Sequence, residues 1–163
     1  MNLAKNFTLE EFTRSQRAEK LGISNVPNAK ELANLQLLAN FMQIVRDRLC
    51  IEIDISSGFR CEKLNNSTPG SSKTSAHRLG LACDSNCHTM PTATYFNLII
   101  SLVNQNILQD FDQIIYEKNS SGSEWVHIGI GGKKRKEILM GFVGKEGNAG
   151  YRNYKWENLF TLI

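Results

Sequence analysis

The stretch FDQIIYEKNSSGSEWVHIGI, residues 111–130, has the pattern of two strands and a turn. Two apolar segments, 111–116 and 124–130, are joined in it by the polar sequence KNSSGS. Short segments rich in Ile, Val and aromatic residues, separated by Ser, Asn and Gly, are typical of a β-hairpin. We therefore expect two paired strands here.

Helices and further strands are predicted before and after this hairpin. Thr8 followed by Glu11, and Asn28 followed by Glu31, are capping-box patterns that open a short helix and a long one. The long helix has apolar residues at helical spacing, and it is expected to lie against a sheet. They are Leu32, Leu35, Leu38, Met42, Val45 and Leu49.

The other expected elements follow from the same kind of pattern. Alternating isoleucines at 51, 53 and 55 predict a half-buried strand, with the change from helix to strand near Cys50. Residues 81–86 read as a strand, 91–105 as a helix and 138–143 as an edge strand. The sequence between 57 and 76 is rich in Ser, Gly, Asn, Thr and Pro and predicts a long loop, a place where functional residues often lie. This mixture predicts an α+β domain.

Length and composition frame the class of protein. The 163 residues, 41% of them hydrophobic, are enough for one domain, 1–163, with a core that folds without metal or disulfide staples. The net charge of +3 is mildly basic and falls short of a nucleic-acid-binding surface. The basic run GGKKRKE at 131–137 is interpreted as a solvated turn, with contact to an anionic polymer as the alternative. We expect a monomer.

The cysteines and the N-terminus bear on where the protein works. Cys50, Cys61, Cys83 and Cys87 are interpreted as free thiols, since a chain of this size does not need a disulfide framework. A structural zinc site formed by Cys83, Cys87 and His88, with Cys61, is the alternative. The segment MNLAKNFTLEEF lacks the apolar run of a secretory signal, and no stretch has the length of a membrane span. These features predict synthesis and retention in the cytoplasm.

Three residues have the types and order of a catalytic zinc site. His77 and Asp84 lie in SAHRLGLACD, and His127 follows in EWVHIGI. Two imidazoles and one carboxylate suit a single Zn²⁺ and leave a fourth position for water. Alternatively, the spacing of His77 and Asp84 arises by chance. His127 could equally be a core histidine beside Trp125.

Glu124, three residues before His127, is the candidate general base. In a regular strand, residues three apart point to opposite faces, so this role requires a bend or bulge at the start of the strand. The alternative is an exposed turn residue.

Three motifs together resemble the zinc D-alanyl-D-alanine peptidase family. They are SGFRCEKLNN at 57–66, SKTSAHRLGLACD at 72–84 and EWVHIGI at 124–130. The opening FTLEEFTRSQRAEKLGISNVPNAKELANLQLLA, residues 7–39, is similar to the entry segment of phage-encoded members. The resemblance covers about residues 6–140. Residues 141–163 form an extension, whose Tyr151, Tyr154 and Trp156 are expected to pack onto the domain, with a glycan-binding strip as the alternative.

The resemblance implies an α+β fold in which a central antiparallel sheet carries the metal and helices pack on it. It also implies one zinc ion held by His77, Asp84 and His127. It assigns Glu124 as general base, Arg60 as the cation that steadies the substrate carbonyl, and Ser75 as a substrate contact.

The expected function is a zinc peptidase that cuts the peptide stems or cross-bridges of peptidoglycan. The absence of a secretory signal fits a phage endolysin that acts on the cell wall after release. The alternatives are a cytoplasmic D-Ala-D-Ala dipeptidase or carboxypeptidase, and a zinc-containing virion module that binds the cell wall without turnover.

Overall fold

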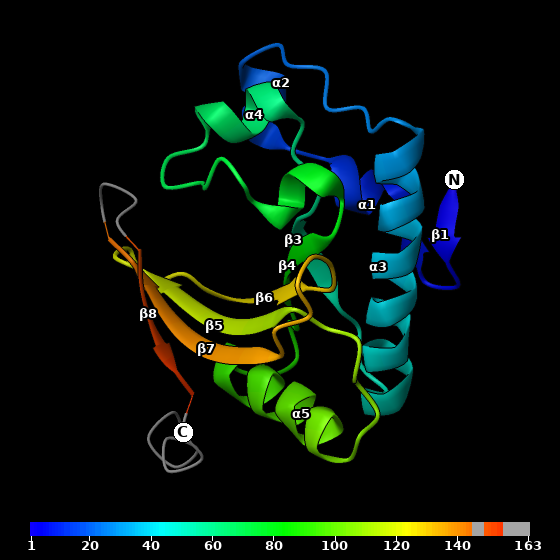
Figure 1. The fold of residues 1–163 in the computed structure, drawn as a ribbon, viewed down its shortest axis with the longest axis vertical. Coiled ribbons are helices and arrows are strands. Elements are labelled where there is room, and N and C mark those ends of the chain that lie inside the picture. Colours follow the sequence, from blue (N-terminus) through cyan, green and yellow to red (C-terminus); the bar gives the residue numbers. More distant parts are fainter. Residues whose placement is uncertain (145–148, 155–163) are drawn as a thin grey trace.

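Six strands form the central sheet, in the order β3-β4-β6-β5-β7-β8 (Figure 1). The computed structural model describes residues 1–144 and 149–154. The strands are β3 (Asp54–Ser57), β4 (Ala82–Asn86), β5 (Gln113–Asn119), β6 (Glu124–Gly129), β7 (Glu137–Val143) and β8 (Ala149–Asn153). A separate two-stranded sheet pairs β1 (Asn2–Ala4) with β2 (Phe7–Thr8). The predicted hairpin is therefore present as β5 and β6, at the middle of the large sheet.

The sheet is antiparallel with one exception. β5 pairs antiparallel with β6, whereas β5 and β7 are parallel. The chain leaves β6 and crosses to the other side of β5 before β7 begins. The segment 138–143 was predicted as an edge strand, but β8 pairs with β7 on its outer side. Part of the predicted extension thus continues the sheet.

The long helix predicted from the Asn28 capping box is α3, and the short helix predicted at Thr8 is α1. Cys50 ends α3 in the left-handed conformation, where the change from helix to strand was expected. The helices are α1 (Leu9–Thr13), α2 (Gln16–Lys20), α3 (Ala29–Leu49), α4 (Glu62–Ser67), the 3₁₀ helix η1 (Ala76–Leu79) and α5 (Thr92–Asn104). Both α4 and the start of η1 fall inside the stretch 57–76 that was predicted as one loop.

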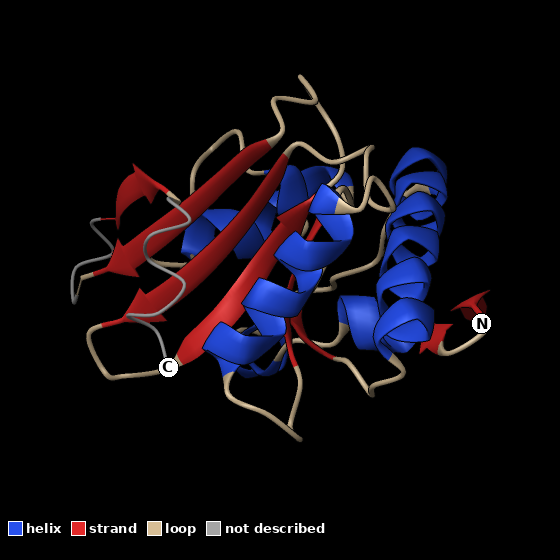
Figure 2. Ribbon diagram, turned by 90° about the horizontal axis from the view of Figure 1, so that it is seen from below, coloured by secondary structure: helices blue, strands red, loops and turns tan. Residues whose placement is uncertain are grey.

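The two faces of the sheet have different roles. α5 covers one face and contacts β5 and β6 (Figure 2). On this side the core includes Phe96, Tyr116, Val126 and Ile128. Since side chains alternate along a strand, the neighbours of these residues point to the other face. That face carries the candidate site. The α+β fold class is confirmed. Within the described part of the chain, no helix has the length and apolarity needed to cross a membrane.

Candidate metal centre

His77, Asp84 and His127 converge at one point, although they come from three different elements. His77 lies in η1, Asp84 in β4 and His127 in β6. Asp84 and His127 are direct partners in the antiparallel pairing of β4 with β6, so their side chains share one face. One ligand atom from each residue lies within 4.8 Å of the others, and this is the sole such group of His, Cys, Asp or Glu in the described residues.

The spacing of the three ligand atoms fits zinc. His77 Nε2 lies 3.3 Å from His127 Nδ1 and 3.4 Å from Asp84 Oδ1, and His127 Nδ1 lies 2.9 Å from Asp84 Oδ1. A tetrahedron with metal–ligand bonds of about 2.0–2.1 Å has edges of about 3.3 Å. The triangle is therefore the right size for three ligands of one Zn²⁺, with a fourth position left open.

The backbone fixes which nitrogen of His77 faces the cluster. His77 Nδ1 lies 2.7 Å from the carbonyl oxygen of Gly58, and a carbonyl can only accept, so Nδ1 carries the hydrogen. The lone pair of Nε2 is then free for a metal, the arrangement usual for zinc-bound histidine. Gly58 also packs against α1: a Cβ there would lie 2.4 Å from the carbonyl oxygen of Phe12. The Ser-Gly-Phe-Arg motif thus has a physical reason for its glycine.

The charges around the cluster suit a cation. Burial opposes ionisation of Asp84, yet the two imidazoles outweigh it and hold the pKa of this carboxyl well below its usual value. Burial lowers the pKa of His77 and keeps its ring neutral. Burial also works against protonation of His127, but the hydrogen bond with Asp84 raises its pKa. Asp84 and His77 therefore favour the ionised carboxylate and the neutral imidazole, the forms that bind metal.

Arg60 is held beside the cluster through its backbone. Its N–H donates to the carbonyl of His77 at 3.1 Å. Asn25 binds on both sides of it, donating to the carbonyl of Phe59 at 2.9 Å and accepting from the N–H of Cys61 at 2.8 Å. The Arg60 Nε is buried and has no hydrogen-bond partner in the described part of the chain. Burial lowers the pKa of Arg60, opposed by the charges of Asp84 and Glu117.

The structure does not bring Glu124 to this cluster. β5 and β6 pair without a bulge from Gln113 to Lys118, so Glu124 and His127 point to opposite faces of the sheet. The Glu124 carboxylate instead accepts from Lys118 Nζ at 3.0 Å. The irregular strand start that its predicted role requires is absent from this hairpin.

Glu117, for which no role was predicted from the sequence, lies on the face of the metal ligands. It pairs with Trp125 across β5 and β6, and Trp125 is two residues before His127. Trp125 Nε1 donates to Glu117 Oε2 at 2.6 Å, and Tyr151 Oη donates to Oε1 at 2.9 Å. Burial raises the pKa of the Glu117 carboxyl, and the charge of Asp84 adds to this rise. The register of the hairpin places Glu117 and His127 on one face, and this register is known only from the strand pairing in the structure.

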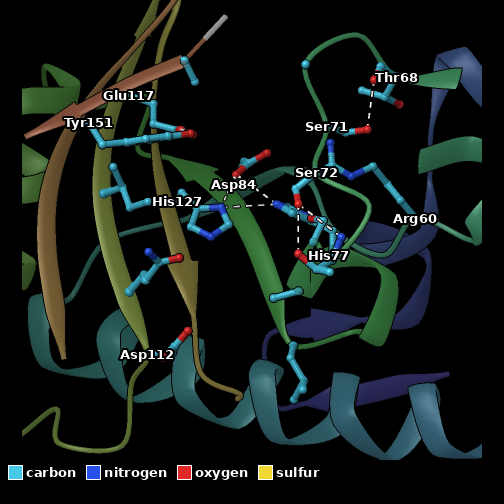
Figure 3. A pocket seen from close by; sticks show the side chains of 18 of the residues that line it. Arg60, Thr68, Ser71, Ser72, His77, Asp84, Asp112, Glu117, His127 and Tyr151 are labelled. Carbon is cyan, nitrogen blue, oxygen red and sulfur yellow. Dashed lines mark hydrogen bonds and ion pairs between the residues drawn. The ribbon is translucent and has the colours of Figure 1, made fainter. Parts of the chain in front are cut away.

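One cavity of about 770 Å³ contains these groups (Figure 3). Glu117 and Tyr151 lie on one side of the metal cluster, and Arg60 lies on the other with the hydroxyl-rich loop of Ser71 and Ser72 (Figure 3). Ser75, which was predicted to contact substrate, lines the same cavity. The structure therefore brings together every predicted site residue except Glu124.

The surroundings of the cysteines and of the basic run 131–137 bear on the alternatives left open by the sequence. All four cysteines are free, and Cys83 points into the core opposite Ile128. In the basic run, Lys134 pairs with Asp110 at 2.8 Å, and Arg135 pairs with Asp112 at 2.7 Å. Residues 132–136 are exposed between β6 and β7, as predicted for a solvated turn, and Lys133 and Arg135 also line the cavity.

The predicted extension is described as far as Tyr154. Tyr154 packs against Phe96, with ring centroids 5.2 Å apart, and Tyr151 contacts Glu117. Trp156 lies outside the described residues. The packing predicted for the two tyrosines is thus seen.

Catalytic zinc sites have three protein ligands and a fourth position for water. The group of His77, Asp84 and His127 therefore indicates a zinc hydrolase. Comparison with known families matches the Peptidase M15 family over residues 5–128. The chain belongs to this family, the M15 family of zinc-dependent, D-Ala-D-Ala carboxypeptidase-type peptidases. No curated protein matches the chain.

Proposed function

We propose that this chain is a zinc-dependent endopeptidase that cleaves the peptide stems or cross-bridges of peptidoglycan. Family membership supports a metallopeptidase with peptidoglycan-type substrates. The observation that carries the proposal is the triangle of His77, Asp84 and His127, flanked by Glu117 and Arg60 in one cavity.

Each group around the metal centre has a role in hydrolysis. When bound, zinc lowers the pKa of a bound water to about 7 and polarises a carbonyl. Glu117 is the proton acceptor: its carboxylate faces the same cavity, and its raised pKa makes it a stronger base than an exposed glutamate. Glu117 takes a proton from the attacking water and delivers it to the leaving amine. Arg60, across the cavity, stabilises the negative charge that develops on the carbonyl oxygen.

The shape around Arg60 favours an extended substrate over a free dipeptide. A second cavity of about 730 Å³ lies on the side of α2 and β3, and Arg60 and Thr68 line both cavities. Substrate residues can therefore be accommodated on either side of Arg60. A dipeptidase needs an enclosed pocket that recognises both termini, whereas an endopeptidase needs a groove that the chain can pass through. This arrangement supports the endopeptidase.

The biological setting is proposed to be phage lysis, in which the enzyme is made in the cytoplasm and acts on the cell wall after release. The similarity of residues 7–39 to the entry segment of phage-encoded relatives supports this setting. In the structure, these residues build α1 and α2 and supply Asn25, which holds the backbone around Arg60. The segment therefore belongs to the construction of the site.

The proposal is tested by digestion of intact sacculi, stem peptides and D-Ala-D-Ala with the zinc-loaded protein, with fragments identified by mass spectrometry. His127→Ala is the control for contaminating activity. Cleavage within stems or cross-bridges supports the proposal. Release of terminal D-Ala alone indicates a carboxypeptidase, and hydrolysis of the dipeptide alone indicates a dipeptidase. Zinc binding with no released fragment indicates a wall-binding module, and each of these three outcomes overturns the endopeptidase.

A further inference from the structure

Four residues on four neighbouring strands form a row beside the metal centre. Trp125 on β6 pairs with Glu117 on β5, Glu117 pairs with Gly141 on β7, and Gly141 pairs with Tyr151 on β8. All four positions therefore share the face of the sheet that carries His127. The family match ends at residue 128, so Gly141 and Tyr151 lie beyond the part of the chain that it covers.

The glycine in this row lets the tyrosine reach the glutamate. A Cβ at Gly141 would lie 2.7 Å from Tyr151 Cε1 and 3.3 Å from Glu117 Cγ. Any side chain at residue 141 would therefore occupy the space that the Tyr151 ring now fills. Because the position is open, the ring extends across β7 and its hydroxyl meets Glu117 Oε1 at 2.9 Å. The hydroxyl has a specific partner, which packing of an edge strand alone would not require.

The carboxylate of Glu117 is held at both oxygens as a result. Trp125 Nε1 donates to Oε2 at 2.6 Å, while Tyr151 donates to Oε1. Glu117 is only 7% exposed, although Tyr151 itself is 52% exposed. Two donors on a buried carboxylate fix its orientation and stabilise its ionised form. A proton acceptor needs both properties.

We propose that Tyr151 is a positioning residue for Glu117, and that the β7–β8 hairpin completes the active site through it. This inference rests on the proposed role of Glu117 as proton acceptor. Tyr151 acts on the orientation and charge of the carboxylate, and Gly141 acts by leaving room for the ring.

Two variants test the row in different ways. Tyr151→Phe keeps the ring and removes the hydroxyl, whereas Gly141→Ala keeps the hydroxyl and displaces the ring. Arg152→Gln is the matched control, since Arg152 lies on the same strand, points to the other face and contacts Met140. All three are compared with the wild type for zinc content, kcat, KM and the pH profile on a stem peptide.

For Tyr151→Phe we expect about a tenfold loss of kcat with KM and zinc content unchanged, the low end of the effect of one hydrogen bond to a charged group. The lost donor stabilises the ionised carboxylate, so the acidic limb of the kcat/KM profile moves to higher pH. Gly141→Ala should show the same shift, and Arg152→Gln should match the wild type. A wild-type kcat and an unmoved acidic limb in Tyr151→Phe overturn the proposal.

A measurement without turnover separates this inference from the proposed function. The ¹³C carboxyl signal of Glu117, followed by NMR against pH in the zinc-loaded protein, reports its pKa directly. We expect a higher pKa in Tyr151→Phe than in the wild type, whether or not the peptide is cleaved. An unchanged titration means that the contact does not act on Glu117. If the wild type is inactive on every substrate but the titration moves, the proposed function fails and the positioning contact stands.

Discussion

Glu117 and Trp125 face each other on neighbouring strands, and the indole nitrogen donates to the carboxylate at 2.6 Å. Because Trp125 is two residues before His127, this pairing also places Glu117 on the face of the metal ligands. Glu124 is three residues before His127 and points to the opposite face, where it binds Lys118. One register therefore decides between two candidate bases.

The register predicts opposite results for two otherwise identical substitutions. Glu117→Gln is expected to lower kcat by about 10²–10⁴-fold, the usual contribution of a general base. Glu124→Gln is expected to leave kcat within about a factor of two, since the Glu124 side chain contacts Lys118 and Tyr116 on the face opposite the metal ligands. Both should retain zinc, which is checked by metal analysis of the same samples. Full activity of Glu117→Gln, or its loss in Glu124→Gln, would reverse the assignment.

The ligands could be predicted from the sequence because their residue types are specific, whereas the base could not be placed without the pairing of strands. The chain has only three histidines, and two of them, His77 and His127, lie with Asp84 in recognisable motifs. Glu117 follows an apolar strand and precedes a polar turn, so on its own it reads as an exposed residue. The helix α4 was hidden by a sequence rich in Asn and Ser, and β8 by the lack of apolar alternation in AGYRN.

The ligand set predicts how zinc acts on stability. Anything that binds only the native state stabilises it, by about 2.7 kcal/mol at a free concentration one hundred times Kd. Zinc should therefore raise Tm of the wild type and of Glu117→Gln by several degrees, with about 2–4 °C expected per kcal/mol for a domain of this size. His127→Ala should show no such rise. Thermal denaturation with and without a chelator gives the comparison, and a zinc-dependent rise in His127→Ala would remove this residue from the ligand set.

Gly58 is predicted to matter for both stability and metal. In Gly58→Ala, the new Cβ would lie 2.4 Å from the Phe12 carbonyl oxygen, so α1 or the 57–60 segment must move. Overpacking of this kind typically costs about 1–3 kcal/mol. The shift also displaces the carbonyl that orients His77, so zinc affinity should fall. Gly122→Ala offers a comparison, because that glycine, although at φ 88°, has no atom within 4 Å of the added Cβ and lies in the β5–β6 turn. It should lose stability and keep zinc affinity.

Arg60 is predicted to contribute to catalysis without stabilising the fold. Its guanidinium makes no ion pair with the described residues, and its Nε is buried without a partner. Arg60→Met should lower kcat by about 10²–10³-fold, as loss of an oxyanion-stabilising group does. The free energy of unfolding should stay the same or rise, because an unpaired cation no longer has to be desolvated. Activity and urea denaturation measured together test this, and a large loss of stability would mean that Arg60 is chiefly structural.

Asp112 is predicted to make the fold sensitive to acid. Its carboxylate accepts from Arg135 Nη2 at 2.7 Å and from Arg135 Nε at 3.1 Å, and these hydrogen bonds lower the pKa of Asp112. The folded pKa is then below the unfolded value of about 3.9, so the contribution to stability is complete above about pH 5 and disappears as pH falls through the folded pKa. Because the Arg135 side chain is 41% exposed, the contribution is about 1 kcal/mol. Urea denaturation of the chelated wild type and Asp112→Asn should therefore differ by this amount at pH 7, and the difference should shrink as pH falls below about 4. A difference that does not shrink with falling pH would contradict the ion pair.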